Sequence, residues 1–230
     1  MTPELTASGP GRGCVRRRTL LAALGSGTAT LSGCSALAPG GDAGDLERRV
    51  SLAASDALPD EHALRIDATV TRPAVTAENP AQLRIAVTNA GPRRALSVGT
   101  DGCALFNRGE GGSDEPPGLW LHRPARAATI ERARPRWVRA ESDRPRMFDA
   151  YGCLLRVFDA GESLARDYVV WDDYRVEGYL EPGTYRWETT VESYEIDDVR
   201  RDAGERAASP TGDPSATLSW GFALTVERLE

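Results

Sequence analysis

The sequence predicts an all-β fold, an antiparallel β-sandwich of about seven to nine strands, preceded by a signal peptide and a flexible tether. Three observations lead to it. Apolar and polar residues alternate in short runs, turn-forming residues separate these runs, and no helical period continues beyond about ten residues. The 230 residues suit one such domain behind a leader. We therefore assign residues 1–33 to the signal peptide, 34–60 to the tether and 61–230 to the sandwich.

The alternation is clearest in residues 64–70 and 83–88, where Leu, Ile, Val or Ala occupies every second position. A period of two places one face of a strand in the core and the other in water. Turn residues such as those at 89–92 and 181–183 end these runs. Further strands are expected at 95–99, 104–106, 119–122, 136–139, 154–158, 164–171, 184–194 and 217–229, and core packing is the expected role of the aromatic residues Trp120, Trp171, Trp187, Trp220, Tyr168, Tyr185 and Phe222.

The first 34 residues have the parts of an export signal. Arg17 and Arg18 precede an apolar stretch of about a dozen residues, which is too short to span a bilayer. The paired arginines resemble a twin-arginine signal, and Leu31-Ser32-Gly33-Cys34 resembles the lipobox of secreted lipoproteins. The alternative is an ordinary cleaved leader with an incidental cysteine.

The lipobox resemblance implies that Cys34 carries a covalent lipid and becomes the first residue of the mature chain. Two lipid chains on one residue give stable membrane attachment. We therefore expect the protein at the cell membrane, lipid-anchored and facing outside, with no cofactor apart from this lipid.

The charge of the mature chain excludes one class of partner. All 28 basic residues are arginine, and the formal net charge of -6 becomes -9 without residues 1–33, which carry four arginines and one glutamate. General nucleic-acid binding needs a phosphate-neutralising basic surface, so we expect no nucleic-acid partner.

The remaining cysteines suggest a disulfide. Cys14 leaves with the leader and Cys34 is assigned to the lipid, so Cys103 and Cys153 remain. A pair of cysteines in an oxidising compartment favours a disulfide. On the chain-entropy model this bond would stabilise the fold by about 4 kcal/mol, because it lowers the conformational entropy of the unfolded chain. Two buried free thiols, or a metal or redox role, are the alternatives.

A short frame resembles a known family of sandwiches. The segments Ala160-Gly161-Glu162-Ser163, Tyr168-Val169-Val170-Trp171 and 178–185, the last of which ends in Pro-Gly-Thr-Tyr, resemble immunoglobulin-like domains related to the Bacillus intracellular proteinase inhibitor (BsuPI-like). The resemblance covers about 30 residues and implies an immunoglobulin-like fold. The leader, the lipobox, residues 171–185 and the acidic, arginine-only composition resemble uncharacterised exported lipoproteins of haloarchaea.

Catalytic and metal-binding motifs are missing from the sequence. The chain has two histidines, His62 and His122, but the mature part contains no GxSxG motif that would mark a nucleophilic serine for either of them to activate. HExxH, Walker and Rossmann motifs are absent as well. The acidic pairs at 172–173 and 197–198 lack the spacing of a calcium loop. We therefore predict no enzyme and no metal site, with a solvated acidic surface as the role of these pairs.

One segment reverses the acidic charge of the chain. Between Arg123 and Arg146 there are eight arginines against three acidic residues. Guanidinium groups bind anionic headgroups, acidic glycans and acidic proteins, and the alternative is that they pair with acidic strands nearby. The residues of this candidate anion or partner surface are Arg132, Arg134, Arg136, Trp137 and Arg139.

The function that fits these features best is a non-catalytic binding or protein-interaction module on a membrane tether, with a surface or secreted protein as its partner. An inhibitor-like role is the narrower version that the family resemblance implies. An exported hydrolase with an acidic site and a structural envelope protein are the alternatives.

The anchor gives the first testable prediction. Mass spectrometry of the membrane fraction should find the mature N-terminus at Cys34 with a lipid-sized addition, and a Cys34→Ser variant should appear in the medium. An unmodified Cys34 in a soluble cellular pool would contradict it.

Overall fold

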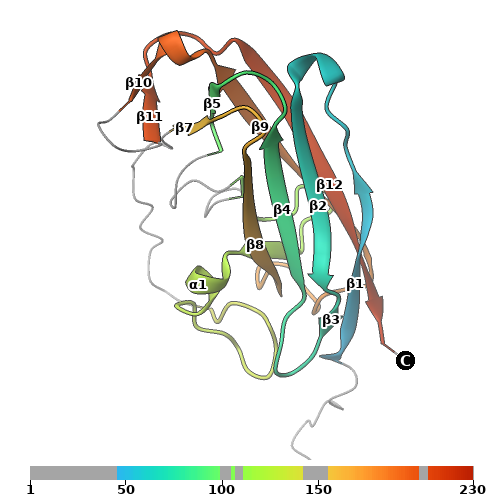
Figure 1. The fold of residues 1–230 in the computed structure, drawn as a ribbon. Coiled ribbons are helices and arrows are strands. Elements are labelled where there is room, and N and C mark those ends of the chain that lie inside the picture. The colour runs from blue at the N-terminus through green and yellow to red at the C-terminus, as the bar shows by residue number, and fades with distance from the viewer. Residues whose placement is uncertain (1–45, 99–104, 107–110, 142–154, 202–206, 230) are drawn as a thin grey trace, which may run out of the picture. The chain divides into compact units, whose positions relative to one another are not determined.

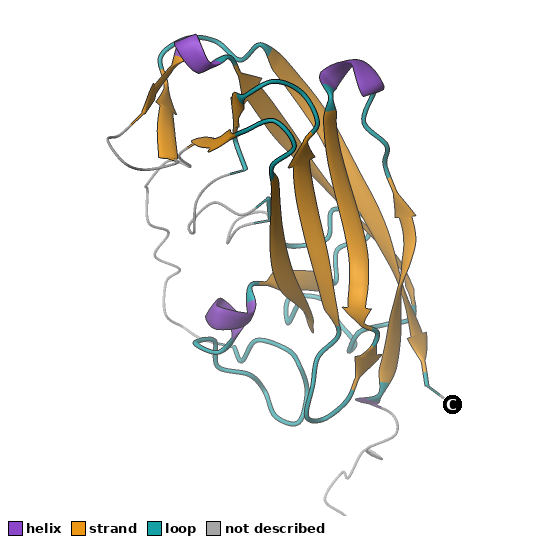
Figure 2. Ribbon diagram, viewed as in Figure 1, coloured by secondary structure: helices purple, strands orange, loops and turns teal. Residues whose placement is uncertain are grey.

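The computed structural model describes residues 46–98, 105–106, 111–141, 155–201 and 207–229, and its strands form two antiparallel sheets (Figure 1, Figure 2). All of these residues belong to one unit, Gly40–Glu230. The sheets pack face to face, so the all-β sandwich predicted from the period-two pattern is present.

The larger sheet has eight strands in the order β10-β11-β7-β5-β9-β12-β1-β3. Its longest pairing joins β9 to β12, in continuous register from Gly183 opposite Val226 to Ser193 opposite Ala216. The bounds of its strands are Arg48–Ser55 for β1, Ala74–Val75 for β3, Arg94–Leu96 for β5, Leu155–Phe158 for β7, Gly183–Tyr194 for β9, Val199–Arg201 for β10, Ala207–Pro210 for β11 and Ala216–Arg228 for β12.

The smaller sheet has four strands in the order β2-β4-β8-β6. Burial alternates along β2 and β4 as the sequence predicts, with Leu64, Ile66, Leu83 and Ile85 buried between exposed or half-buried neighbours. The bounds are Leu64–Arg72 for β2, Gln82–Asn89 for β4, Leu119–His122 for β6 and Ser163–Asp172 for β8.

Helical structure in the described residues is limited to short turns. The helix α1 spans Pro124–Ala127, and 3-10 turns lie at Asp60–His62 and Ile196–Asp198. In this part of the chain no helix has the length and apolar character needed to cross a membrane.

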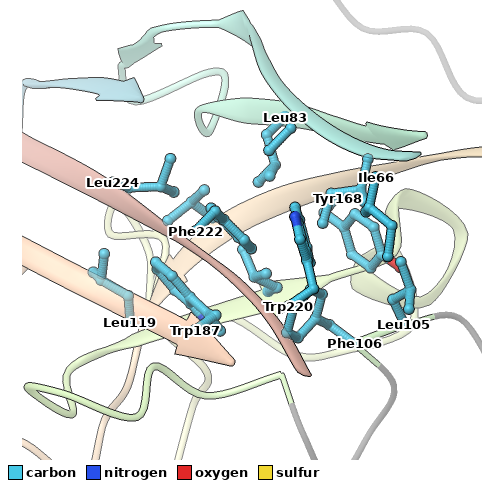
Figure 3. Close-up of a cluster of buried hydrophobic side chains, with 14 of the residues drawn as sticks. Ile66, Leu83, Leu105, Phe106, Leu119, Tyr168, Trp187, Trp220, Phe222 and Leu224 are labelled. Carbon is cyan, nitrogen blue, oxygen red and sulfur yellow. The ribbon is translucent and has the colours of Figure 1, made fainter. Parts of the chain in front are cut away.

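The core lies between the two sheets and is built on aromatic residues (Figure 3). The rings of Trp187 and Phe222 stack with centroids 5.2 Å apart, and Phe106 meets Tyr168 edge to face at 6.3 Å. The buried indole nitrogens of Trp187 and Trp220 donate to the carbonyl oxygens of Gly111 and Asp56. The core therefore buries large apolar area without leaving these two indole nitrogens unsatisfied.

Three sequence-based expectations about the strands differ from the structure. The described residues contain twelve strands, more than the expected seven to nine, because β3, β10 and β11 are too short to show a period of two. The predicted strand at residues 136–139 is the end of a hairpin-like loop, where only isolated bridges form. Of the expected strand at 104–106, residue 104 lies outside the described residues, and Leu105 and Phe106 are buried but not in a strand.

The expected tether also reaches too far into the domain. Residues 48–55, assigned to the tether, form β1, which pairs with β12 on one side and β3 on the other. Only Arg48 and Val50 of β1 are buried, so its apolar pattern is too weak to reveal a strand. The pairing with β12 places it in the sheet.

The aromatic core gives a prediction about stability. Trp187→Ala should lower the free energy of unfolding by about 3 to 5 kcal/mol, because it removes a fully buried ring and leaves a cavity against Phe222. Urea unfolding measures the change. Leu52→Ala, at a side chain that is 38% exposed, is the control and should change stability by less than about 0.5 kcal/mol. Equal effects of the two substitutions would contradict this core.

Candidate functional site

The arginine-rich segment forms a hairpin-like loop, here called the arginine hairpin, over residues 131–140. Arg132 bridges Arg139 across it, and backbone bonds from Ala133 N to Val138 O (3.0 Å) and from Ala140 N to Glu131 O (2.9 Å) join its arms. The hairpin follows α1, at the lower end of the domain in Figure 1. This end also contains the start of β1 and the end of β8.

Trp137 fixes the hairpin to the sandwich. Its ring is half-buried against the core and lies 5.8 Å from that of Trp171, and its indole nitrogen donates to the carbonyl oxygen of Thr76 at 2.6 Å. Its backbone nitrogen donates to the hydroxyl of Tyr179 at 3.1 Å, and its carbonyl oxygen accepts from Asp172 N at 2.8 Å. Four contacts to three separate segments therefore hold this residue in place.

Two arginines of the hairpin lie over aromatic rings. The guanidinium of Arg132 is 3.7 Å from the ring centroid of Trp137, and that of Arg136 is 5.4 Å from the ring centroid of Tyr179. Burial raises the pKa of Tyr179, which keeps its hydroxyl protonated. A guanidinium stacked on a ring is partly ordered and still presents its N–H donors to solvent.

The hairpin arginines differ from many others in the chain in their pairing. Elsewhere Arg84 pairs with Asp167 at 2.8 Å, Arg156 with Glu162 at 3.1 Å, and Arg186 with Asp56 at 2.6 Å. Within the described part of the chain, no carboxylate forms an ion pair with any of the hairpin arginines, and Arg136 acts on the buried Asp172 only by attraction at longer range. The alternative that these arginines pair with nearby acidic strands is therefore not seen among the described residues. The hairpin arginines are Arg132, Arg134, Arg136 and Arg139, of which Arg134 and Arg136 are exposed.

Tyr179 connects the hairpin to the start of the first described strand. Its carbonyl oxygen accepts from Arg48 Nη2 at 3.2 Å, the next carbonyl, Leu180 O, accepts from Arg48 Nε at 3.0 Å, and the Arg48 guanidinium lies 5.7 Å from the Tyr179 ring centroid. Arg48 and Arg136 thus both contact the ring of one tyrosine. The point where the chain enters the sandwich is therefore directly beside the arginine hairpin.

A second aromatic cluster lies on the outer face of the four-stranded sheet, beside the hairpin. Trp120 pairs with Trp171 in register, and His122 stacks on Trp120 at 6.1 Å and meets Trp171 edge to face at 5.1 Å. Arg175 lies 5.3 Å from the centroid of Trp120. The expected core role is correct for Tyr168, Tyr185, Trp187, Trp220 and Phe222, whereas Trp171 is buried on this outer face and Trp120 is half-buried there.

The acidic pair at the end of β8 is buried rather than solvated, which corrects the expectation for these two residues. The Oδ1 atom of Asp172 accepts from Leu180 N at 2.7 Å, and the Asp173 carboxylate pairs with Arg175. Burial raises the pKa of Asp172 to about 6, against the lowering effect of the Leu180 hydrogen bond. The two carboxylates therefore support the loop from 173 to 182 and do not face a common ligand.

The other candidate residues do not gather with the hairpin into a reactive group. His62 lies in a 3-10 turn, and its carbonyl oxygen accepts from Arg94 at 2.8 Å. A pocket beside the core is lined mainly by apolar residues such as Val98, together with Tyr168 and Arg166, and its lining contains no carboxylate or histidine. Among the described residues no three His, Cys, Asp or Glu side chains are grouped to hold a metal ion.

Several predicted site residues lie outside the described residues. They are Arg17, Arg18 and Cys34 of the leader and anchor, and Cys103 and Cys153 of the expected disulfide.

Sequence reasoning missed the residues that order the hairpin. In the sequence Tyr179 stands out only as part of the family frame, and Arg48 lies within the predicted tether. A buried arginine donating to two carbonyl oxygens of a distant loop leaves no local pattern, because its partners are more than 130 residues away. The stacking of Arg132 on Trp137, five residues apart, was the only part with a signal in the sequence.

Comparison with known proteins gives one match. A family model described as "Domain of unknown function (DUF8130)" matches residues 15–104, which include Cys34 and the strands β1 to β5. The arginine hairpin lies beyond the matched residues. No curated protein and no solved structure matches the chain.

The buried carboxyl gives a prediction about pH. The folded chain binds the Asp172 proton more tightly than the unfolded chain, in which aspartate has a pKa of about 3.9. The contribution of Asp172 to the free energy of unfolding should therefore be largest below about pH 4 and fall as pH rises to about 6, by roughly 1 to 2 kcal/mol after screening.

The test compares the wild type with Asp172→Asn, whose side-chain oxygen still accepts from Leu180 N. The variant should be the more stable of the two at pH 7, and the difference should shrink towards pH 4, as measured by urea unfolding at several pH values. Asp173→Asn is the matched control and should be destabilised at pH 7, because it loses its ion pair with Arg175. A pH-independent difference for Asp172→Asn would contradict the assignment.

Proposed function

We propose that this chain is an exported lipoprotein, anchored through Cys34 on the outer face of the cell membrane, whose β-sandwich is a non-catalytic binding module. The arginine hairpin is its contact surface. The observation that carries the proposal is the set of hairpin arginines without a described carboxylate partner, in a chain with a net charge of -6. Guanidinium groups without a carboxylate partner, two of them on the exposed side chains of Arg134 and Arg136, are suited to an anionic ligand.

The order of the hairpin supports a binding role. Contacts of Trp137 with Thr76, Tyr179 and Asp172 hold the loop, and two of its guanidinium groups rest on rings. A surface that is ordered before binding loses less conformational freedom when its ligand arrives. The buried carboxyl of Asp172, the strongest candidate for acid chemistry, is engaged in holding Leu180 and gives no support to a hydrolase.

The finer classification is part of the same proposal. Two packed antiparallel sheets are compatible with an immunoglobulin-like sandwich, and the frame that ends at Tyr185 resembles sandwiches related to the Bacillus intracellular proteinase inhibitor. Immunoglobulin-like domains bind partners through loops at the ends of the sandwich, which is where the arginine hairpin lies.

Photo-crosslinking in native membranes tests the function. A diazirine amino acid replaces Ala133, an exposed residue between Arg132 and Arg134, so all hairpin arginines remain. The expected result is a discrete adduct, with lipid or protein, that is lost when Arg132, Arg134 and Arg136 are each changed to Glu. The control probe at Ala57, an exposed residue in the loop after β1 at the opposite end, should give no such adduct.

An arginine-independent adduct pattern, or no adduct of any class from position 133, would refute the arginine hairpin as a binding surface. Unfolding midpoints of the variants, measured by circular dichroism, should fall by only a few degrees, because the substitutions remove two cation–π contacts at the surface and no described ion pair.

A further inference from the structure

We propose that the ligand of the arginine hairpin is the anionic headgroup surface of the same membrane that holds Cys34, so that the domain lies with this end against the bilayer. The inference rests on the lipid anchor of the proposed function and adds the chemical class of the ligand. Its first support is position. The start of β1 and the arginine hairpin meet at Tyr179, whose ring contacts both Arg48 and Arg136.

Chain length keeps the hairpin within reach of the anchor. Eleven residues lie between Cys34 and Leu46, the first described residue, and even a fully extended chain over that interval spans only about 40 Å. An anchor this close raises the concentration of the bilayer surface around the hairpin to the order of millimolar. The lipid headgroups are therefore already close to the hairpin, whereas a separate protein partner would first have to diffuse to it.

The chemistry of the surface fits headgroup phosphates. Each guanidinium offers a planar fork of N–H donors that matches phosphate oxygens, and four such groups lie on one ten-residue loop. The loop from 173 to 182, which follows β8 at the same end, exposes Tyr174 and Val176. Tyrosine is an amphipathic side chain that is favoured at the level of lipid headgroups.

The charge distribution favours one orientation. The mature chain carries a formal net charge of -9, so most of its surface is repelled by an anionic bilayer while the hairpin is attracted. Each arginine near such a surface increases binding by about a factor of five, and the effect decays within a Debye length of about 10 Å at moderate salt. Contact through the hairpin end combines attraction with relief of repulsion.

The experiment uses the full chain purified with its lipid, verified by mass spectrometry at Cys34 and carrying the diazirine probe at Ala133. It is reconstituted into protein-free vesicles of phosphatidylglycerol and phosphatidylcholine in equal amounts, or of phosphatidylcholine alone. Illumination should yield lipid adducts from position 133 on the anionic vesicles, with far lower yield on phosphatidylcholine and at 1 M NaCl. The probe at Ala57 should give no lipid adduct on either vesicle.

Two triple variants that lose the same charge at different positions distinguish an effect of the hairpin site from an effect of net charge. The triple change Arg132→Gln, Arg134→Gln and Arg136→Gln should lower the ratio of docked to undocked domain about 100-fold. The control changes Arg65→Gln, Arg200→Gln and Arg201→Gln, which remove the same charge from exposed positions elsewhere, should leave the adduct yield unchanged.

Adducts that are equal on both vesicle types, or equal in the two triple variants, would overturn the inference. A protein adduct in native membranes together with no lipid adduct on anionic vesicles would also overturn it. That combination would identify an acidic protein as the ligand and leave the binding module itself intact. If position 133 gave no adduct either in native membranes or on anionic vesicles, the proposed function would be refuted as well.

Discussion

The long antiparallel pairing of β9 with β12 is the interaction on which the rest of the structure depends. It joins the β1 side of the larger sheet to the β5 side, and it carries Trp187, Trp220 and Phe222, whose rings form the centre of the core. Because these rings are fully buried, the smaller sheet is held at a fixed distance over them. The direction of β8, and with it the position of Asp172, follows from that packing.

A series of hydrogen bonds connects Asp172 to the arginine hairpin at the surface. Its carboxyl holds Leu180, which brings the carbonyl oxygens of Tyr179 and Leu180 to Arg48 and the Tyr179 hydroxyl to Trp137. The arginine hairpin is thus the last member of a series of contacts that begins in the core. This explains how a loop with few apolar residues keeps a defined shape: the indole nitrogen and the backbone of Trp137 form hydrogen bonds to three segments that the sandwich already positions.

The sequence predicted the parts of this structure that depend on local pattern. Alternation identified β2 and β4, and the run of residues 184–194 identified β9 almost to the residue. The sequence leaves β1 within the predicted tether because only Arg48 and Val50 are buried in it, and its place in the sheet comes from β12, far away in the sequence. For the candidate site, too, the local pattern was predictable from the sequence and the long-range contacts were not. The cluster of arginines was visible, but its support by Tyr179 required a contact over 42 residues, and the contacts of Arg48 with the Tyr179 loop span more than 130.

The exclusive use of arginine bears on how such a surface works in an acidic protein. A lysine ammonium is a compact, strongly hydrated charge, whereas a guanidinium stacks on a ring through its face and keeps its edge available for hydrogen bonds. Arg132 on Trp137 and Arg136 on Tyr179 use this property, so the positive charges are held at one end instead of moving towards acidic neighbours. A lipid on one residue fixes a domain near a bilayer and leaves its orientation free. A second, ordered contact of opposite charge, placed beside the point where the chain enters the sandwich, is the simplest device that would fix the orientation too.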